Sequence, residues 1–339
     1  MSTDSNNSFS QIATAVDQPL VFEPVFSRRR WGGRKLKDLL GKAIGPEDDY
    51  AESWEIADHA DGQSIVSEGP FGGATLSQLL QGFNSEILGR VSGQSQFPLL
   101  IKYLDANDWL SLQVHPNDQQ AKQFNPLENG KTEAWVILHA EPTSQICCGL
   151  KAGVTADDLR RRLQEGTVQE ALHIFPAVVG DCVFVPAGTV HAIGPGIVLA
   201  EVQQQSNLTF RLYDWDRLDA DGKGRELHIE ESIECIDFDR GPVDPQKVVA
   251  LSRHGYAFEE LARCPYFSIR RHNTVDEFSI ALDQRFRILM VTSGLVTLTV
   301  AGHETHVAAG ETTLIPAQCE NVEVAAVGGR ASVLEILQP

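Results

Sequence analysis

The chain has 339 residues, of which 42% are hydrophobic and 22% are charged. These values exclude a disordered chain and a small disulfide-stapled domain, and the length predicts about two domains. With 28 basic and 46 acidic residues the formal net charge is −18, which argues against nucleic acid and anionic membranes as partners.

The sequence shows no secretory signal and no membrane span. Residues 1–17 are polar, lack Lys and Arg, and contain no apolar core, and no run approaches ~18 uninterrupted apolar residues. Six cysteines show no CxxC pair and no disulfide framework, since only Cys147 and Cys148 are close in sequence. We therefore expect a cytoplasmic protein with reduced, mostly buried cysteines and a disordered tail over residues 1–18.

Short apolar runs bounded by turn residues predict a mainly β protein with the strands of a sandwich or barrel. The clearest expected strands cover residues 97–104, 135–138, 182–185, 197–200 and 295–300. Two helices interrupt this pattern. One follows Thr75, and the other runs from Thr155, a predicted N-cap, to about Gln164. Neither carries an obvious reactive group, so both are expected to be structural insertions.

A weak internal repeat predicts two related β-barrels. Gly180 is followed after five residues by Pro186 and Ala187, and Gly310 is followed after five residues by Pro316 and Ala317. Prolines at 242 and 245 suggest a boundary between the barrels. We expect a catalytic domain with a helical insertion over residues 19–241 and a second barrel over residues 246–339.

A strand over residues 110–116 carries polar side chains on one whole face. Strict alternation places Ser111, Gln113 and His115 on that face and Leu112 and Val114 on the other.

Two further segments bring in potential metal ligands. Lys131 and Glu133 share a face at the start of another strand, and a tight turn delivers His191 at the head of a third. His115, Glu133 and His191, with the Gln113 amide oxygen as a fourth ligand, are typical of a catalytic metal site with open positions. Nitrogen and oxygen ligands without thiolate permit Zn, Mn, Fe or Co.

Two pairs of polar residues follow His191. Glu201 and Gln203 alternate out of an apolar run, and Arg211 and Tyr213 alternate in the next one. An arginine aimed into a metal pocket suits phosphate or developing enolate charge, because its fork of donors matches oxyanions. The alternative for Arg211 is a surface salt bridge to Asp214 or Asp216.

Other catalytic motifs are missing from the sequence. It contains no GxSxG, GxGxxG or GxxxxGK[ST], so hydrolase, Rossmann and P-loop chemistry lack their anchoring turns. His303 and His306 are one residue short of the zinc-protease spacing and lie in a strand-like context, where they would face opposite sides.

Together these stretches resemble the type I mannose-6-phosphate isomerases (phosphomannose isomerases), in their shorter bacterial form, which are zinc enzymes of the cupin superfamily. The matching segments cover most of the chain and lie at residues 23–26, 31–35, 52–56, 111–118, 130–135, 185–192 and 211–217. The resemblance implies two cupin-type jelly-roll barrels. It also implies an aldose–ketose isomerase that interconverts mannose 6-phosphate and fructose 6-phosphate through an enediolate.

The resemblance also implies roles for individual residues. His115, Glu133 and His191 would hold Zn²⁺, with Gln113 joining them, and Arg211 would be the active-site arginine. Lys131 and Ser111 fall where the family places substrate contacts. For the proton carrier, Glu201 and Lys131 both remain open, since either could titrate near neutral pH.

The second barrel departs from the motif, since Gln318 and Asn321 stand where the first repeat has Gly188 and His191. A metal is therefore not expected there. Two other functions remain open: an iron-dependent cupin oxygenase, and a regulatory protein that binds metal and sugar phosphate without turnover. The sequence does not indicate the oligomeric state.

Overall fold

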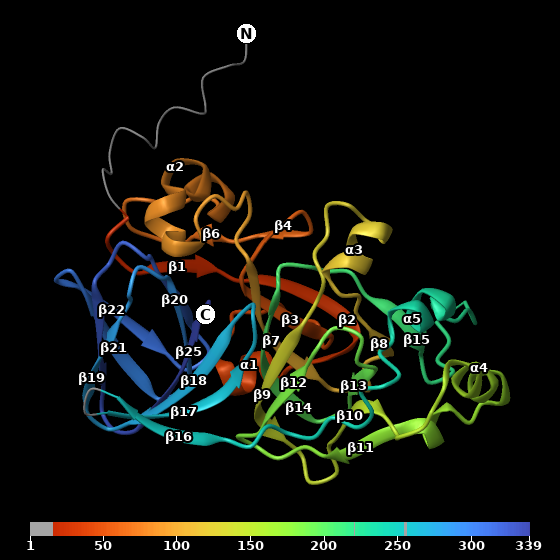
Figure 1. Ribbon diagram of the computed structural model, residues 1–339. Helices are drawn as coiled ribbons and strands as arrows, with labels where there is room; N and C mark the ends of the chain where they lie inside the picture. Colours follow the sequence, from red (N-terminus) through yellow and green to blue (C-terminus); the bar gives the residue numbers. More distant parts are fainter. Residues whose placement is uncertain (1–15, 220, 254–255) are drawn as a thin grey trace.

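The computed structural model describes residues 16–219, 221–253 and 256–339, so most of the tail expected over residues 1–18 lies outside the described residues. The protein is mainly β, as predicted, and its strands form paired sheets of jelly-roll type (Figure 1). None of the described helices is long and apolar enough to cross a bilayer.

Two sheets build the N-terminal jelly roll. The six-stranded sheet has the order β12 (Cys182–Val185), β9 (Glu133–Ala140), β14 (Ile197–Gln204), β7 (Leu99–Ala106), β3 (Tyr50–Ile56) and β2 (Val25–Gly33). The five-stranded sheet has the order β11 (Leu172–Pro176), β10 (Gln145–Leu150), β13 (His191–Ile193), β8 (Leu112–Val114) and β15 (Phe210–Tyr213). A separate small hairpin pairs β4 (Asp58–His59) with β5 (Gly62–Gln63).

Two more sheets build the second jelly roll. The eight-stranded sheet has the order β16 (Val249–Arg253), β17 (Tyr256–Arg263), β18 (Ser268–Thr274), β25 (Ala331–Leu337), β20 (Arg287–Ser293), β23 (Thr312–Ile315), β1 (Leu20–Glu23) and β6 (Ile65–Val66). The four-stranded sheet has the order β19 (Glu277–Ala281), β24 (Asn321–Ala326), β21 (Leu295–Val300) and β22 (His303–Ala308). Strand β22 contains His303 and His306, which confirms the strand predicted for these two residues.

Most of the helices lie at the edge of the molecule, and the first one lies between the two jelly rolls, where Leu36 and Leu40 join the shared apolar cluster (Figure 1). They are α1 (Lys35–Leu40), α2 (Leu76–Leu88), α3 (Asp118–Phe124), α4 (Ala156–Glu165) and α5 (Ile229–Cys235). Both predicted helices are confirmed: Thr75 forms a capping box with Gln78 at α2, and Thr155 accepts the Asp158 N–H at α4. The second ends at Glu165, one residue beyond the predicted end.

Alternation along each strand separates the cores. In the N-terminal jelly roll, side chains of one parity, such as Leu104, Trp135 and Leu199, pack between its two sheets. Side chains of the other parity, such as Tyr103 and Val136, face the second jelly roll and share one apolar cluster with it. The six-stranded and eight-stranded sheets therefore lie back to back around a common core.

Strand β1 crosses between the two halves of the chain. Leu20 pairs with Leu314 and Val21 with Thr313, so this N-terminal strand belongs to the sheet of the second jelly roll. The boundary near residue 241 stays a prediction, and strand pairing runs across it.

The internal repeat corresponds to one strand–turn–strand unit used twice. Gly180 and Gly310 both have positive φ, +94° and +89°, and stand before β12 and β23. His191 then begins β13, and Asn321 begins β24.

Candidate active site

Three strands, two from the five-stranded sheet and one from the six-stranded sheet, bring together the residues predicted to bind a metal. His115 follows β8, Glu133 begins β9, and His191 begins β13 opposite Gln113 of β8. The turn before His191 is tied to the end of β8, because the Gly188 N–H donates to the His115 carbonyl over 2.8 Å. Gly188 has φ +84°, a conformation that favours glycine.

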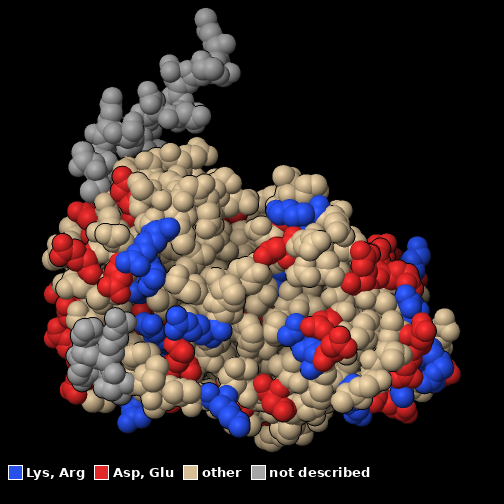
Figure 2. Space-filling model, in the orientation of Figure 1, with Lys and Arg blue, Asp and Glu red and all other residues tan. Residues whose placement is uncertain are grey.

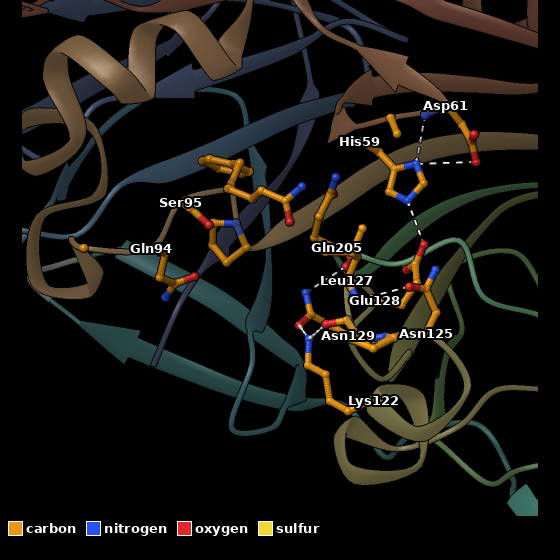
Figure 3. Close-up of a pocket in the computed structure, with 16 residues that line it drawn as sticks. His59, Asp61, Gln94, Ser95, Lys122, Asn125, Leu127, Glu128, Asn129 and Gln205 are labelled. Atoms are coloured by element: carbon orange, nitrogen blue, oxygen red, sulfur yellow. Dashed lines mark hydrogen bonds and ion pairs between the residues drawn. The ribbon is translucent and has the colours of Figure 1, made fainter.

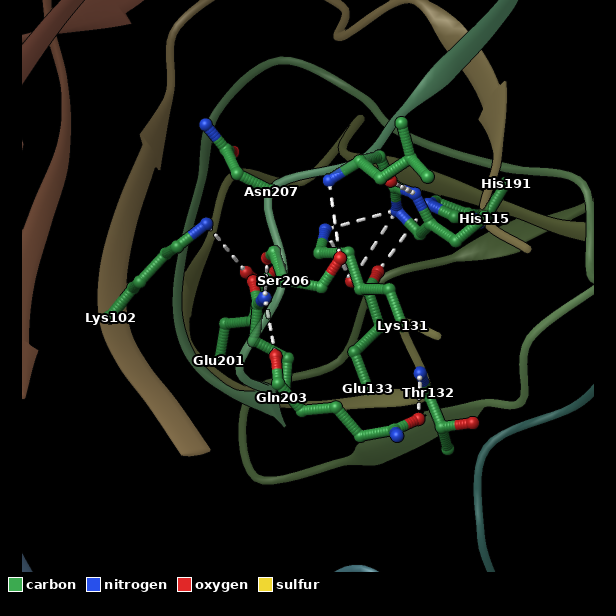
Figure 4. A network of polar contacts seen from close by, with 12 residues as sticks. Lys102, His115, Lys131, Thr132, Glu133, His191, Glu201, Gln203, Ser206 and Asn207 are labelled. Carbon is green, nitrogen blue, oxygen red and sulfur yellow. Dashed lines mark hydrogen bonds and ion pairs between the residues drawn. The ribbon is translucent and has the colours of Figure 1, made fainter. Parts of the chain in front are cut away.

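The three side chains converge on one point inside the N-terminal jelly roll (Figure 4). One ligand atom from each of His115, Glu133 and His191 lies within 4.8 Å of the others. Glu133 Oε1 is 3.4 Å from His191 Nε2, and Oε2 is 3.5 Å from His115 Nε2. Each residue is at most 1% exposed.

Backbone carbonyls orient both imidazoles. His115 Nδ1 lies 3.0 Å from the Leu208 carbonyl, and His191 Nδ1 lies 2.9 Å from the Thr189 carbonyl. A carbonyl only accepts, so each Nδ1 carries the proton and each Nε2 lone pair faces Glu133. Burial lowers the pKa of His115 well below its usual value and that of His191 to about 4, so both rings are neutral, as metal ligands must be.

These residues fit a divalent metal ion. His191 Nε2 is buried and makes no hydrogen bond within the described chain. Such a group needs an explanation, and a metal ligand is one. Lys131 Nζ lies 2.8 Å from Glu133 Oε2 and 3.0 Å from His115 Nε2. The ligand atoms of these two residues therefore already face a positive charge. Among the described His, Cys, Asp and Glu side chains, His115, Glu133 and His191 are the group that clusters in this way.

A cavity of about 210 Å³ adjoins the cluster. The residues predicted from the sequence that line it are Ser111, Gln113, Lys131, Glu201 and Arg211. Further polar residues line it that the sequence did not single out: Arg29, Glu52, Lys102, Asn207 and Arg225.

Glu201 lies on β14 in a dry, hydrogen-bonded setting. Its Oε2 accepts the Trp135 indole N–H over 3.1 Å, and its Oε1 lies 3.3 Å from Lys102 Nζ. Burial and the nearby Glu133 charge raise the pKa of Glu201 above its usual value. Burial alone would lower the pKa of Lys102, but the charges of Glu52 and Glu201 raise it, so Lys102 remains a cation.

Arg211 lines the cavity rather than forming the alternative surface salt bridge. Its Nη1 donates to the Glu226 carbonyl over 2.8 Å, and its buried Nε makes no hydrogen bond in the part of the chain that is described. Asp214 instead pairs with Arg217 and Arg225.

Gln203 and Tyr213, which the sequence paired with Glu201 and Arg211, form hydrogen bonds away from the cavity. The Gln203 amide donates to the carbonyls of Gln204 and Ser206, and the Tyr213 hydroxyl donates to Asp216. Neither side chain lines the cavity.

Lys102 could have been identified from the sequence. It stands inside the apolar run 99–104, and a lysine in a wholly buried strand needs carboxylate partners. Arg29 and Arg225 lie outside the matching segments, and no local pattern indicates that their side chains reach the cavity.

The second jelly roll contains a buried charge cluster. Glu335 on β25 shares the inward face with Val333 and lies 2.8 Å from Arg287 Nε and 2.9 Å from His272 Nε2. The guanidinium group thus supplies the cation for this buried carboxylate.

Comparisons with known proteins agree across the chain. Residues 20–129 match the family model described as phosphomannose isomerase type I, catalytic domain, and residues 258–334 match mannose-6-phosphate isomerase, cupin domain. The chain is 40% identical to mannose-6-phosphate isomerase ManA of Bacillus subtilis, over 82% of this chain and 86% of that protein. It is 34% identical to mannose-6-phosphate isomerase of Streptococcus mutans, over 88% and 92%.

Solved structures share the fold. The crystal structure of mannose 6-phosphate isomerase from Bacillus subtilis superposes with a TM-score of 0.86 at 31% identity, covering 94% of this chain and 99% of that one. A putative mannosephosphate isomerase from Archaeoglobus fulgidus has a TM-score of 0.77 at 20% identity, covering 96% and 99%, and supports the fold alone.

Proposed function

Because the chain belongs to the type I mannose-6-phosphate isomerase family, we propose that it interconverts mannose 6-phosphate and fructose 6-phosphate. The observation that carries this proposal is the convergence of His115, Glu133 and His191 beside a cavity that also contains Glu201 and Arg211. A metal-dependent aldose–ketose isomerase needs these two parts, a site for a cation and a proton carrier next to it.

We assign His115, Glu133 and His191 as the metal ligands, with zinc as the ion. Gln113 is the fourth ligand in this proposal, because it lies opposite His191 in the β8–β13 register and lines the cavity. A bound divalent cation would supply Lewis-acid stabilisation of negative charge on the sugar oxygens, worth several kcal/mol.

Glu201 is the proposed carrier of the proton between C1 and C2. Its pKa is raised by burial, which lets a carboxyl group accept and return a proton closer to neutral pH. Lys131 is the alternative carrier. Its ammonium already lies against Glu133 and His115, which supports a role in holding charge at the metal ligands and favours Glu201 for the proton.

The phosphate end of the substrate requires local positive charge, since the protein carries −18 overall. Figure 2 shows acidic side chains spread over the visible face and gathered around α5, which carries Glu230, Glu231 and Glu234. The cavity differs from this acidic surface, because five basic side chains line it: Arg29, Lys102, Lys131, Arg211 and Arg225. Arg211, whose Nε is free of hydrogen bonds within the described residues, is the proposed anchor, with Ser111 as a neutral donor.

We place the protein in the cytoplasm. All six cysteines are free, and five of them are buried, which suits a reducing compartment.

The test is a coupled assay for fructose 6-phosphate formed from mannose 6-phosphate. We expect activity that a chelator removes and that added Zn²⁺ restores. A protein that binds the sugar phosphate and zinc without isomerising it would contradict the proposal and favour a regulatory role. Substrate-dependent oxygen uptake with an iron-loaded protein would favour an oxygenase.

A further inference from the structure

A short loop between β14 and β15 contacts one of the proposed metal ligands and lines the cavity beside them. The Leu208 carbonyl accepts from His115 Nδ1 over 3.0 Å and so fixes the direction in which His115 presents Nε2. Asn207, the preceding residue, lines the cavity. The position of residues 206–208 therefore affects both a ligand and the substrate pocket.

Glu128 holds this loop from outside the cavity. Its Oε2 accepts the Ser206 hydroxyl over 2.9 Å and the Asn207 N–H over 3.3 Å. The same Ser206 oxygen accepts the Leu208 N–H over 3.2 Å. Ser206 is fully buried and the Glu128 side chain is only 14% exposed, which limits competition from solvent for these bonds. A continuous chain of hydrogen bonds thus runs from Glu128 through Ser206 and Leu208 to His115.

His59 and Asp61 hold Glu128 and Asn207 from the β4–β5 hairpin, beside a polar hollow (Figure 3). His59 Nδ1 accepts the Asp61 N–H over 3.1 Å, so Nε2 carries the proton and donates to Glu128 Oε1 over 3.1 Å. Asp61 Oδ2 accepts the Asn207 amide over 2.7 Å. The hydrogen bond from His59 lowers the pKa of Glu128, so it is an ionised acceptor at neutral pH.

We propose that Glu128, oriented by His59, is a positioning residue for the metal centre, acting through residues 206–208 to fix the imidazole of His115. Glu128 belongs neither to the ligand cluster nor to the residues that line the catalytic cavity, and it meets that lining only through the backbone N–H of Asn207. Its effect must pass through the loop. The inference rests on the proposed metal site, and residues that orient metal ligands from outside typically contribute 10–100-fold to affinity or activity.

The experiment measures Zn²⁺ affinity of the full chain by competition with a chromophoric chelator. We expect Glu128→Ala to weaken zinc binding about 10–100-fold. The matched control is Glu68→Ala, an exposed glutamate in the loop before α2, which should bind zinc within about twofold of wild type.

A conservative variant separates positioning from general stability. In Glu128→Gln the amide oxygen can still accept from Ser206 and Asn207, but the amide NH2 then faces the Nε2–H donor of His59, so we expect it to recover part of the affinity lost in Glu128→Ala. If Glu128→Ala fails to fold, Ser206→Ala removes the central link and should weaken zinc binding in the same direction.

Equal zinc affinity in wild type, Glu128→Ala and Ser206→Ala would overturn the inference. So would lost isomerase activity in Glu128→Ala with unchanged zinc affinity, because Glu128 would then act on the substrate. If wild type bound zinc in a Glu128-dependent way but did not isomerise, the proposed function would fail and this inference would stand.

Discussion

Replacing Trp135 by Phe tests whether Glu201 moves the proton. The change removes the indole N–H that Glu201 accepts over 3.1 Å and keeps an aromatic ring in the buried position. A hydrogen bond to a charged group contributes ~1.5–3 kcal/mol. One pH unit corresponds to ~1.4 kcal/mol, so losing this bond should disfavour the carboxylate and move the acid limb of kcat up by about one to two pH units. Activity should recover at higher pH, where Glu201 is ionised again.

The assay follows initial rates of fructose 6-phosphate formation over pH 5–9, with bound zinc measured in parallel. Trp135 also packs edge-on against His191, with ring centroids 5.4 Å apart, so metal content must be shown to be retained. Trp109→Phe, outside the cavity, controls for loss of an indole. An unmoved acid limb in zinc-loaded Trp135→Phe would refute the reasoning and return the proton to Lys131.

Two further predictions concern arginine and buried charge. Arg211→Ala should lower kcat/KM by about 10²–10³ while zinc affinity, measured by chelator competition, stays unchanged; full turnover would show that Arg211 has no catalytic role. Burial alone would raise the pKa of Glu335, but His272 and Arg287 lower it to about 2, so its stabilisation is complete above pH ~4.5 and is lost as the pH falls toward 2. Glu335→Gln should therefore lower the free energy of unfolding by about 3–5 kcal/mol at pH 7. In denaturant titrations the loss of stability at acid pH should become smaller in this variant. A variant as stable as wild type would contradict this prediction.

Strand periodicity was enough to predict most of the candidate site. On β8 the polar Gln113 alternates with the apolar Leu112 and Val114, so it faces the opposite side of the strand. On β9 Glu133 shares its parity with Trp135 and Ile137, which pack between the two sheets, so it faces the same interior. The turn geometry around Gly188 is equally local, which is why the placement of His191 could be predicted. The assignment of roles to these residues remains a proposal.

Contacts between distant segments were not predictable in this way. Glu128 and His59 lie 69 residues apart in the chain and meet because the β4–β5 hairpin and the segment after α3 pack beside one another. The crossing of β1 into the second sheet is likewise set by the shared apolar cluster, because the run 20–23 carries no signal for which of two similar sheets it joins.

The path of β1 makes the two halves of the chain inseparable. A polypeptide cut near residue 241 would leave β23 without its β1 neighbour and would expose to water the faces of Tyr103 and Met290 that now lie in one cluster. The second jelly roll therefore stabilises the N-terminal one, because the two pack against each other through this cluster. Substitutions in the core of the second jelly roll can consequently weaken catalysis, because they destabilise the six-stranded sheet that carries Glu133 and Glu201.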